Sequence, residues 1–169
     1  MITLKQIKAH LENSVNPLIF FDDDTDGLAS FLLIRKYLDR GKGIPVRHNV
    51  LDGSYLKAVK YYNPDLILIL DKHGITEEFI DDAKVPILWI DHHPLEDIKG
   101  VKHFNPRYLN KEDNRPTSYW CYEIVKENLW IAMVGIVADW HLDHYDEFCK
   151  KFNDLANSNL KEAPDVLFN

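Results

Sequence analysis

Residues 85–94 read Val85-Pro86-Ile87-Leu88-Trp89-Ile90-Asp91-His92-His93-Pro94, an apolar run of strand length that ends abruptly in a carboxylate and two imidazoles. The same pattern occurs twice upstream, where residues 17–21 run into the acidic stretch 22–27 and residues 66–70 run into Asp71. Apolar strands without polar alternation are typical of a parallel sheet that is covered on both faces. Each of these strands would deliver metal or phosphate ligands at its end.

The rest of the chain alternates predicted strands with predicted helices. Strands are expected at residues 18–21, 44–51, 66–70, 85–90 and 99–104, and helices at residues 3–13, 28–38, 55–62, 76–81, 117–127, 130–138 and 145–156. This alternation implies right-handed crossovers and an α/β fold, with a parallel (Rossmann-like) sheet of about five strands and helices on both faces. Ligands bind beyond the carboxyl ends of the strands in such sheets, so we expect a metal site there.

Composition restricts the class of protein. The 169 residues, 46% of them hydrophobic, suffice for one domain, or for one domain with a small appendage. The formal net charge of −7 argues against a generally basic nucleic-acid-binding surface, although bound cations would offset acids that act as metal ligands. The two cysteines form no CxxC pair, and the chain has no signal-peptide pattern and no apolar stretch of membrane-spanning length. These features predict a reduced, cytoplasmic protein with no membrane partner.

The acidic stretch after the first strand holds four aspartates within five positions, Asp22, Asp23, Asp24 and Asp26. Mutual repulsion raises the pKa values of crowded carboxylates unless cations neutralise them. Asp24 and Asp26 would share one side of an extended backbone, which suits two neighbouring ions. The alternative is a solvated acidic turn in which Asp24 or Thr25 caps the following helix.

Three further positions offer ligands. Asp71 ends a strand of five consecutive Leu and Ile residues, where an unpaired carboxylate would be costly unless loop amides bind it. Asp91, His92 and His93 combine ligand types that suit Mn, Zn or Fe; the alternative is a helix-capping Asp91 beside two surface histidines. Asp139 follows a long apolar segment and would otherwise be an ordinary residue at a helix end.

All four sites would meet in one cleft, and together they predict a two-metal hydrolase with ions about 3.5–4 Å apart. Asp71 would bridge the ions, and the cations would stabilise the charge that develops on the phosphoryl oxygens. The predicted catalytic residues are Asp71, Asp91, His92 and His93.

These motifs resemble, in order, those of the DHH phosphoesterase superfamily: Asp24-Thr25-Asp26-Gly27, Asp71, Asp91-His92-His93-Pro94 and Asp139. Residues 22–28 are most similar to the RecJ-like branch. The resemblance covers roughly residues 15–145 and implies an N-terminal DHH catalytic domain over residues 1–145. Residues 146–169 are expected to be a C-terminal helix and tail. Nothing in residues 145–169 resembles the substrate-gripping second domain of the family, so the tail is expected to be a linker toward an absent domain.

The resemblance implies metal ligands at Asp22, Asp24, Asp26, Asp71, His92 and Asp139. Asp24 is similar to a ligand of the first ion, Asp26 to a ligand of the second, and Asp71 to the shared ligand. His92 and Asp139 would complete the second ion. At residue 22 many relatives have a histidine, and the aspartate found here is a candidate ligand of the first ion.

Contacts to substrate are implied at other positions. His93 resembles the histidine that holds a phosphate oxygen, and Asp91 resembles the acid that orients its neighbours. Arg107 and Arg115 would hold phosphates, and Ser118 at a helix start would donate to one. For the two arginines a surface or packing role is the alternative.

The implied activity is hydrolysis of phosphodiester bonds in single-stranded DNA or RNA or in short oligonucleotides, as in a RecJ-like exonuclease. The resemblance also implies Mn²⁺ as the cofactor, with two ions expected and Mg²⁺ or Co²⁺ as substitutes, and ligands that are rich in oxygen and poor in imidazole agree with this. The alternative is a weakly active or inactive scaffold domain that binds replication or repair proteins. A small-molecule phosphatase or pyrophosphatase fits the first motif less well.

Overall fold

The computed structural model describes residues 1–96 and 98–152. Its central sheet has five parallel strands in the order β2-β1-β4-β6-β7. The strands are β1 (Pro17–Asp22), β2 (Lys42–Val46), β4 (Leu66–Leu70), β6 (Ile87–Ile90) and β7 (Lys102–Phe104). Two short strands, β3 (Val50–Leu51) and β5 (Gly74–Ile75), pair in parallel as a separate small sheet. The prediction of a five-stranded parallel sheet is confirmed.

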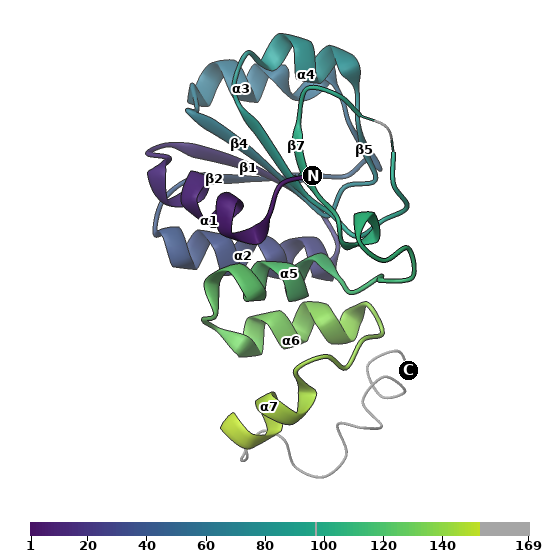
Figure 1. The fold of residues 1–169 in the computed structure, drawn as a ribbon. Coiled ribbons are helices and arrows are strands. Elements are labelled where there is room, and N and C mark those ends of the chain that lie inside the picture. Colours follow the sequence, from purple (N-terminus) through teal and green to yellow (C-terminus); the bar gives the residue numbers. More distant parts are fainter. Residues whose placement is uncertain (97, 153–169) are drawn as a thin grey trace.

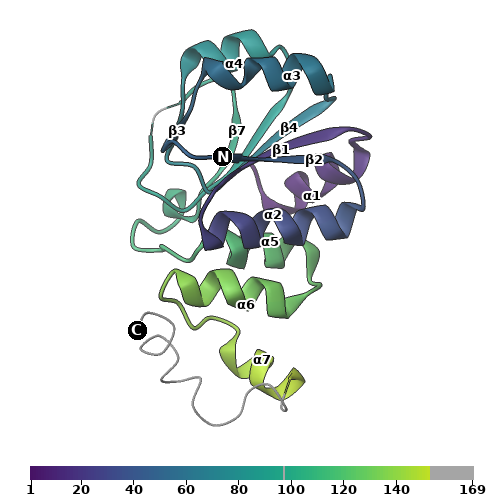
Figure 2. The same ribbon diagram turned by 180° about the vertical axis from the view of Figure 1, so that it is seen from behind.

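Helices cover both faces of this sheet, as predicted. On one face lie α3 (Leu56–Tyr62) and α4 (Glu77–Ala83), and on the other lie α1 (Leu4–Asn13), α2 (Thr25–Leu38) and α5 (Thr117–Val125) (Figure 1). Figure 2 shows from behind that α6 (Leu129–Ala138) forms a further layer against α2 and α5, with α7 (Tyr145–Lys151) beyond it. Short 3-10 turns lie at Gly53–Tyr55 and Pro106–Tyr108. Among the described helices, none is long and apolar enough to cross a bilayer.

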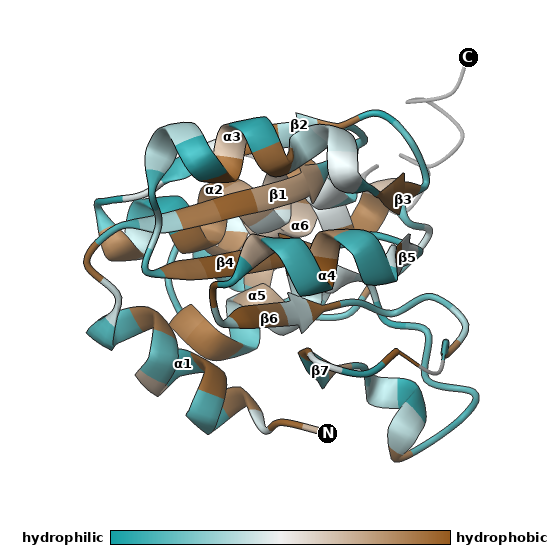
Figure 3. Ribbon diagram, turned by 90° about the horizontal axis from the view of Figure 1, so that it is seen from above, coloured by the Kyte–Doolittle hydropathy of each residue, from teal (hydrophilic) through white to brown (hydrophobic). Residues whose placement is uncertain are grey.

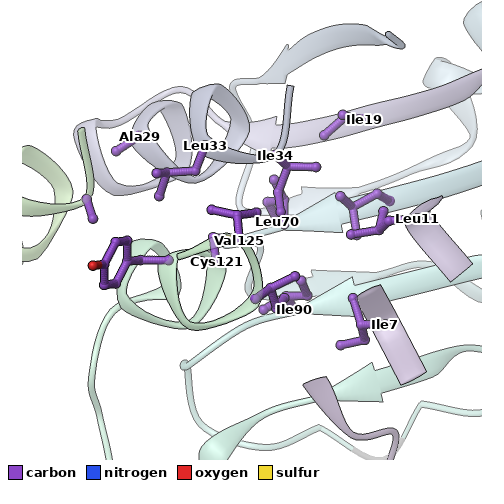
Figure 4. Close-up of a cluster of buried hydrophobic side chains, with 14 of the residues drawn as sticks. Ile7, Leu11, Ile19, Ala29, Leu33, Ile34, Leu70, Ile90, Cys121 and Val125 are labelled. Atoms are coloured by element: carbon purple, nitrogen blue, oxygen red, sulfur yellow. The ribbon is translucent and has the colours of Figure 1, made fainter. Parts of the chain in front are cut away.

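The strands lack polar alternation because both of their faces are buried. In β1, Leu18 and Phe20 pack with the side chains under α3 and α4, whereas Ile19 and Phe21 belong to the larger core on the opposite face. Figure 3 shows the resulting hydrophobic β1, β4 and β6 enclosed by helices with mixed surfaces. In the larger core, residues of α1, α2 and α5 meet β4 and β6, as at Leu70 (Figure 4).

Several predicted elements differ from the structure in their bounds, among them the strand expected at residues 99–104, which is observed as Lys102–Phe104. The strand expected at residues 44–51 is divided, because Arg47, His48 and Asn49 are exposed and separate β2 from β3. The helix expected from residue 28 begins at Thr25 instead, since Asp24 accepts a hydrogen bond from the backbone N–H of Gly27 and caps the helix. The last predicted helix is observed as Tyr145–Lys151, and its expected continuation over residues 153–156 lies outside the described residues.

The buried His103 of β7 gives the fold a predictable pH dependence. Its ring stacks on Trp89 with centroids 3.9 Å apart, and its Nδ1 lies 3.1 Å from the Tyr108 hydroxyl. Burial lowers the pKa of His103 to about 4, below its usual 6.5. The folded chain therefore keeps His103 neutral while the unfolded chain takes up a proton, so stability falls as the pH drops from about 6.5 toward 4. At about 1.4 kcal/mol per pH unit, the loss reaches roughly 2–3 kcal/mol.

Comparison with the His103→Phe variant isolates this effect, because phenylalanine keeps a ring on Trp89 and does not titrate. Between pH 7 and pH 4 the wild type should lose roughly 2–3 kcal/mol more free energy of unfolding than the variant in urea titrations. The exposed His48→Phe serves as the matched control and should follow the wild type. Parallel losses in wild type and His103→Phe would contradict the assignment.

Candidate metal centre

Four of the six predicted metal ligands, together with His93, converge where β4 and β6 end and where α2, α5 and α6 meet them. Ligand atoms of Asp71, His92 and His93 lie within 4.8 Å of one another, and so do those of Asp26, His92 and Asp139. His92 is common to both sets. Its Nε2 is 3.4 Å from Oδ1 of Asp71 and 3.3 Å from Oδ2 of Asp139. Residues from four separate segments of the chain thus form one cluster around this imidazole.

The N-terminus of α5 holds two of these carboxylates in place. The backbone N–H groups of Thr117 and Ser118 donate to Oδ2 and Oδ1 of Asp26, at 2.7 and 2.9 Å. These groups have no partner inside the helix, and the helix dipole favours negative charge at this end. The hydroxyl of Thr117 also donates to Oδ1 of Asp71 at 3.0 Å. One helix start therefore orients carboxylates from α2 and from the end of β4.

Asp71 leaves β4 through a left-handed backbone conformation, with φ of 60°. Aspartate and asparagine tolerate this conformation better than most residues. The backbone N–H of Asp71 donates to the carbonyl oxygen of Ile90 at 3.0 Å, which ties the turn to the end of β6. The turn is thus anchored to the strand that carries His92 and His93.

The electrostatics of the cluster favour a cation. Burial raises the pKa of Asp26 well above its usual value, and the charges of Asp71 and Asp139 raise it further. Burial also raises the pKa of Asp71 to about 6, against the opposing effect of His92. Burial lowers the pKa of His92, but Asp71 and Asp26 outweigh burial and raise it to about 10. Protonated His92 then offsets the crowded carboxylates, and a divalent ion among the same oxygen and imidazole ligands would do so more fully. The donor set fits a divalent metal ion.

His93 is held beside this cluster by Asp91. Its Nδ1 lies 2.6 Å from Oδ1 of Asp91, and its backbone N–H donates to Oδ2 of the same carboxylate at 3.1 Å. Asn105 donates to Oδ2 of Asp91 at 3.2 Å and to the carbonyl oxygen of His93 at 2.9 Å. The imidazole of His73 lies against His93, with ring centroids 3.6 Å apart. Asp91 thus fixes one ring nitrogen of His93 and leaves Nε2 for another partner.

Comparison with known proteins identifies the family. The family model described as DHH family, N-terminal domain, matches residues 16–156. The chain belongs to the DHH family. This confirms the resemblance drawn from the motifs of the sequence.

Solved structures agree with this assignment. The chain is similar to RecJ in complex with Mn²⁺ from Thermus thermophilus, with 19% identity, a TM-score of 0.61, and coverage of 82% of this chain and 24% of that one. It is also similar to exonuclease RecJ bound to manganese, with 19% identity, a TM-score of 0.63, and coverage of 82% and 43%. A DHH domain from a member of a family of ribosomal proteins gives 16% identity, a TM-score of 0.57, and coverage of 78% and 38%.

At these identities the likeness shows the fold, and the chain spans less than half the length of each of these three structures. No curated protein matches the chain.

The aspartates of the first acidic motif, residues 22–26, have different roles in this DHH domain. Asp24 is the exposed N-cap of α2, and its Oδ1 accepts from the N–H of Gly27 at 2.8 Å. Asp26 is buried in the first turn of the helix, so the expectation that the two share one side of an extended backbone is wrong. The capping alternative is confirmed for Asp24. Asp22 pairs with Lys72 at 3.1 Å, and neither Asp22 nor Asp24 belongs to the two converging sets.

The two arginines predicted to hold phosphates make contacts within the DHH domain. Arg107 donates from Nε to the carbonyl oxygen of His92 at 2.8 Å, which supports the backbone of the motif. Arg115 forms two hydrogen bonds with the Asp113 carboxylate and lies over the rings of Tyr119 and Trp120. Phosphate binding by either arginine stays a prediction, and a phosphate would compete with these contacts.

Ser118 contributes its backbone rather than its hydroxyl. The hydroxyl is buried, has no hydrogen-bond partner in the described part of the chain, and faces Gly135 of α6, where an added Cβ would lie 2.5 Å from Oγ. The predicted donation from Ser118 to a phosphate therefore stays a prediction without a contact that supports it.

Sequence reasoning missed the contributions of Thr117 and Asn105 to the site. A signal for Thr117 exists, because Pro116 precedes it at a predicted helix start, where free N–H groups attract carboxylates. Nothing local marks Asn105, whose contacts to Asp91 and His93 depend on β7 lying beside β6.

Proposed function

We propose that this DHH domain is a metal-dependent phosphodiesterase that hydrolyses single-stranded nucleic acid or short oligonucleotides, with Mn²⁺ as the preferred ion. The convergence of Asp26, Asp71, His92 and Asp139 from separate segments carries the proposal. The likeness to manganese-bound RecJ structures supports both the ion and the class of substrate.

Asp26, Asp71, His92 and Asp139 would hold the ion. When bound, a divalent ion there supplies Lewis acidity toward a phosphoryl oxygen and lowers the pKa of a coordinated water. The chain itself fixes the ligands, because α5 donates two N–H groups to Asp26 and the Thr117 hydroxyl donates to Asp71. Ligands oriented by such contacts need little rearrangement when the metal or substrate binds.

His93 is the residue proposed to contact the substrate. Asp91 binds its Nδ1, which leaves Nε2 to donate to a phosphate oxygen. Asn105 in turn holds both Asp91 and the backbone of His93. Asp91 and Asn105 are therefore positioning residues, and His93 is the proposed catalytic residue on the substrate side.

The scaffold alternative is less well supported than the enzyme. A domain that only binds replication or repair proteins has no need of buried carboxylates. Burial raises the pKa values of Asp26, Asp71 and Asp139, and neighbouring carboxylates raise them further. Carboxylates that crowd together in this way cost stability unless a ligand uses them. The presence of these three buried carboxylates therefore favours metal-dependent catalysis over a scaffold role.

Asp139→Asn tests the proposal. With labelled single-stranded oligonucleotide and saturating Mn²⁺, the wild type should release shortened products, and EDTA should stop the reaction. Asp139→Asn should reduce the rate on the order of 100-fold or more, because a charged ligand is lost. The matched control is Asp143→Asn on the same loop, which removes a carboxylate paired with His141 and should leave the rate within about 3-fold.

Absence of Mn²⁺-dependent cleavage in a folded wild type would contradict the proposed activity. Equal rate losses in Asp139→Asn and Asp143→Asn would contradict the assigned site, since only Asp139 lies in the converging set.

A further inference from the structure

Lys72 is a buried ammonium at the edge of the metal centre. It follows Asp71 directly, and its side chain is fully buried. Its Nζ donates to the carbonyl oxygen of Val46 at 3.1 Å and lies 3.1 Å from Oδ2 of Asp22. A buried ammonium is unfavourable unless oxygen atoms replace its water, and both contacts supply such atoms. The ends of β1, β2 and β4 thus enclose a fixed positive charge.

Lys72 pairs with Asp22, which the family resemblance implied to be a metal ligand. Asp22 gives one oxygen to Lys72, and its Oδ1 accepts from the backbone N–H of Asp23 at 2.8 Å. Asp24 gives one oxygen to the N–H of Gly27 as a helix cap. Both oxygens of Asp22 and one oxygen of Asp24 are therefore bound to groups of the chain itself.

The remaining ligands fall into two sets that share His92. Among the described residues, the converging ligand atoms come from Asp26, Asp71, His92, His93 and Asp139. The two sets depend on the same atom, Nε2 of His92, which lies 3.4 Å from Asp71 and 3.3 Å from Asp139. One imidazole nitrogen binds one ion at a time, so we take the two sets as one ion site. A second ion would need Asp22 or Asp24, and at Asp22 it would meet the ammonium of Lys72 at a ligand oxygen.

We propose that the domain binds a single divalent ion, through Asp26, Asp71, His92 and Asp139, and that the ammonium of Lys72 takes the place of a second ion beside Asp22. The inference rests on the proposed function for the identity of the first ion. The ammonium of Lys72 pairs with Asp22 and excludes a further cation by repulsion. Because its side chain is buried, Lys72 acts through this charge and not by contact with substrate.

A Mn²⁺ titration of the whole chain tests this inference without measuring activity. Isothermal titration and metal analysis should give one Mn²⁺ per chain for the wild type, and electron paramagnetic resonance should show a magnetically isolated ion. Lys72→Met keeps the length of the side chain and removes the charge, so Asp22 becomes available. This variant should bind two ions with a coupled spectrum, as expected for ions about 3.5–4 Å apart.

Two further variants complete the design. Lys60→Met replaces an exposed lysine of α3 and should bind one ion like the wild type. Asp22→Asn combined with Lys72→Met removes the whole ion pair and should return the count to one, which identifies Asp22 as the released ligand. Lys72→Met alone leaves the carboxylate of Asp22 without its partner, which could disturb folding. The double variant removes both charges of the pair and so serves as the control for this effect.

The outcomes separate this inference from the proposed function. Two ions on the wild type would overturn the single-ion centre and leave the metal-dependent activity standing. No bound ion on the wild type would overturn both. One ion on a folded Lys72→Met would overturn the role of the lysine charge.

Discussion

Asp71→Asn is expected to abolish Mn²⁺-dependent hydrolysis while it stabilises the metal-free domain. Burial raises the pKa of Asp71 to about 6, so at pH 8 the ionised carboxylate opposes folding. Removing it should add about 1–3 kcal/mol to the free energy of unfolding in EDTA, since each pKa unit corresponds to about 1.4 kcal/mol. Asparagine still accepts from Thr117 and tolerates the left-handed backbone at φ of 60°. Loss of the charged ligand should lower the rate on the order of 1,000-fold.

Mn²⁺ should reverse the order of stability. At an ion concentration about 100 times its Kd, the wild type gains about 2.7 kcal/mol, whereas the Asp71→Asn variant gains little. Urea titrations with EDTA and with Mn²⁺ measure both effects. The control is Asp39→Asn, an exposed aspartate with φ of 51°, which should change neither stability nor the response to Mn²⁺. Loss of stability in metal-free Asp71→Asn would contradict the electrostatic account of the site.

Gly27→Ala is expected to destabilise the domain by about 1–3 kcal/mol and to weaken Mn²⁺ binding. Helix propensity alone predicts a gain of about 1 kcal/mol, because Gly27 lies in the first turn of α2. An added Cβ would lie 2.4 Å from the carbonyl oxygen of Asp22 and 2.8 Å from its backbone nitrogen. These backbone atoms belong to β1 and cannot move without shifting the strand. The neighbouring ligand Asp26 would shift with the helix.

Gly53→Ala is the matched control for this prediction. The three heavy atoms nearest to its added Cβ belong to the carboxylate of Glu78, at 2.6–2.7 Å, and that flexible group can turn away. The change should stay within about 0.5 kcal/mol. Urea midpoints and Mn²⁺ titrations of both variants check the difference. A stabilised Gly27→Ala would show that α2 is not packed against β1 as described.

Much of the fold follows from local patterns. In residues 66–70 every side chain is apolar, and the structure buries all five of them in β4. The same property predicted β1 and β6, because a strand that is covered on both faces needs no polar alternation. The division of residues 44–51 was not predicted, since the exposed break depends on β3 pairing with β5.

The candidate site is predictable only in part. Parallel strands end at one edge, so Asp71 and the motif at residues 91–93 had to lie near each other. The role of each carboxylate in the acidic stretch could not be predicted from the sequence. Asp22, Asp24 and Asp26 lie within five positions, yet one pairs with a lysine, one caps a helix and one receives the N-terminus of α5.

The sequence by itself determined the covered parallel sheet and the edge at which its ligands gather, because strand periodicity and strand ends are local properties. Only the tertiary structure decided which carboxylates remain open to a metal ion. A carboxylate binds the donors that the fold brings within reach, and those donors come from distant parts of the chain. Thr117 is 91 residues from Asp26, and Lys72 is brought to Asp22 only by the pairing of β1 with β4.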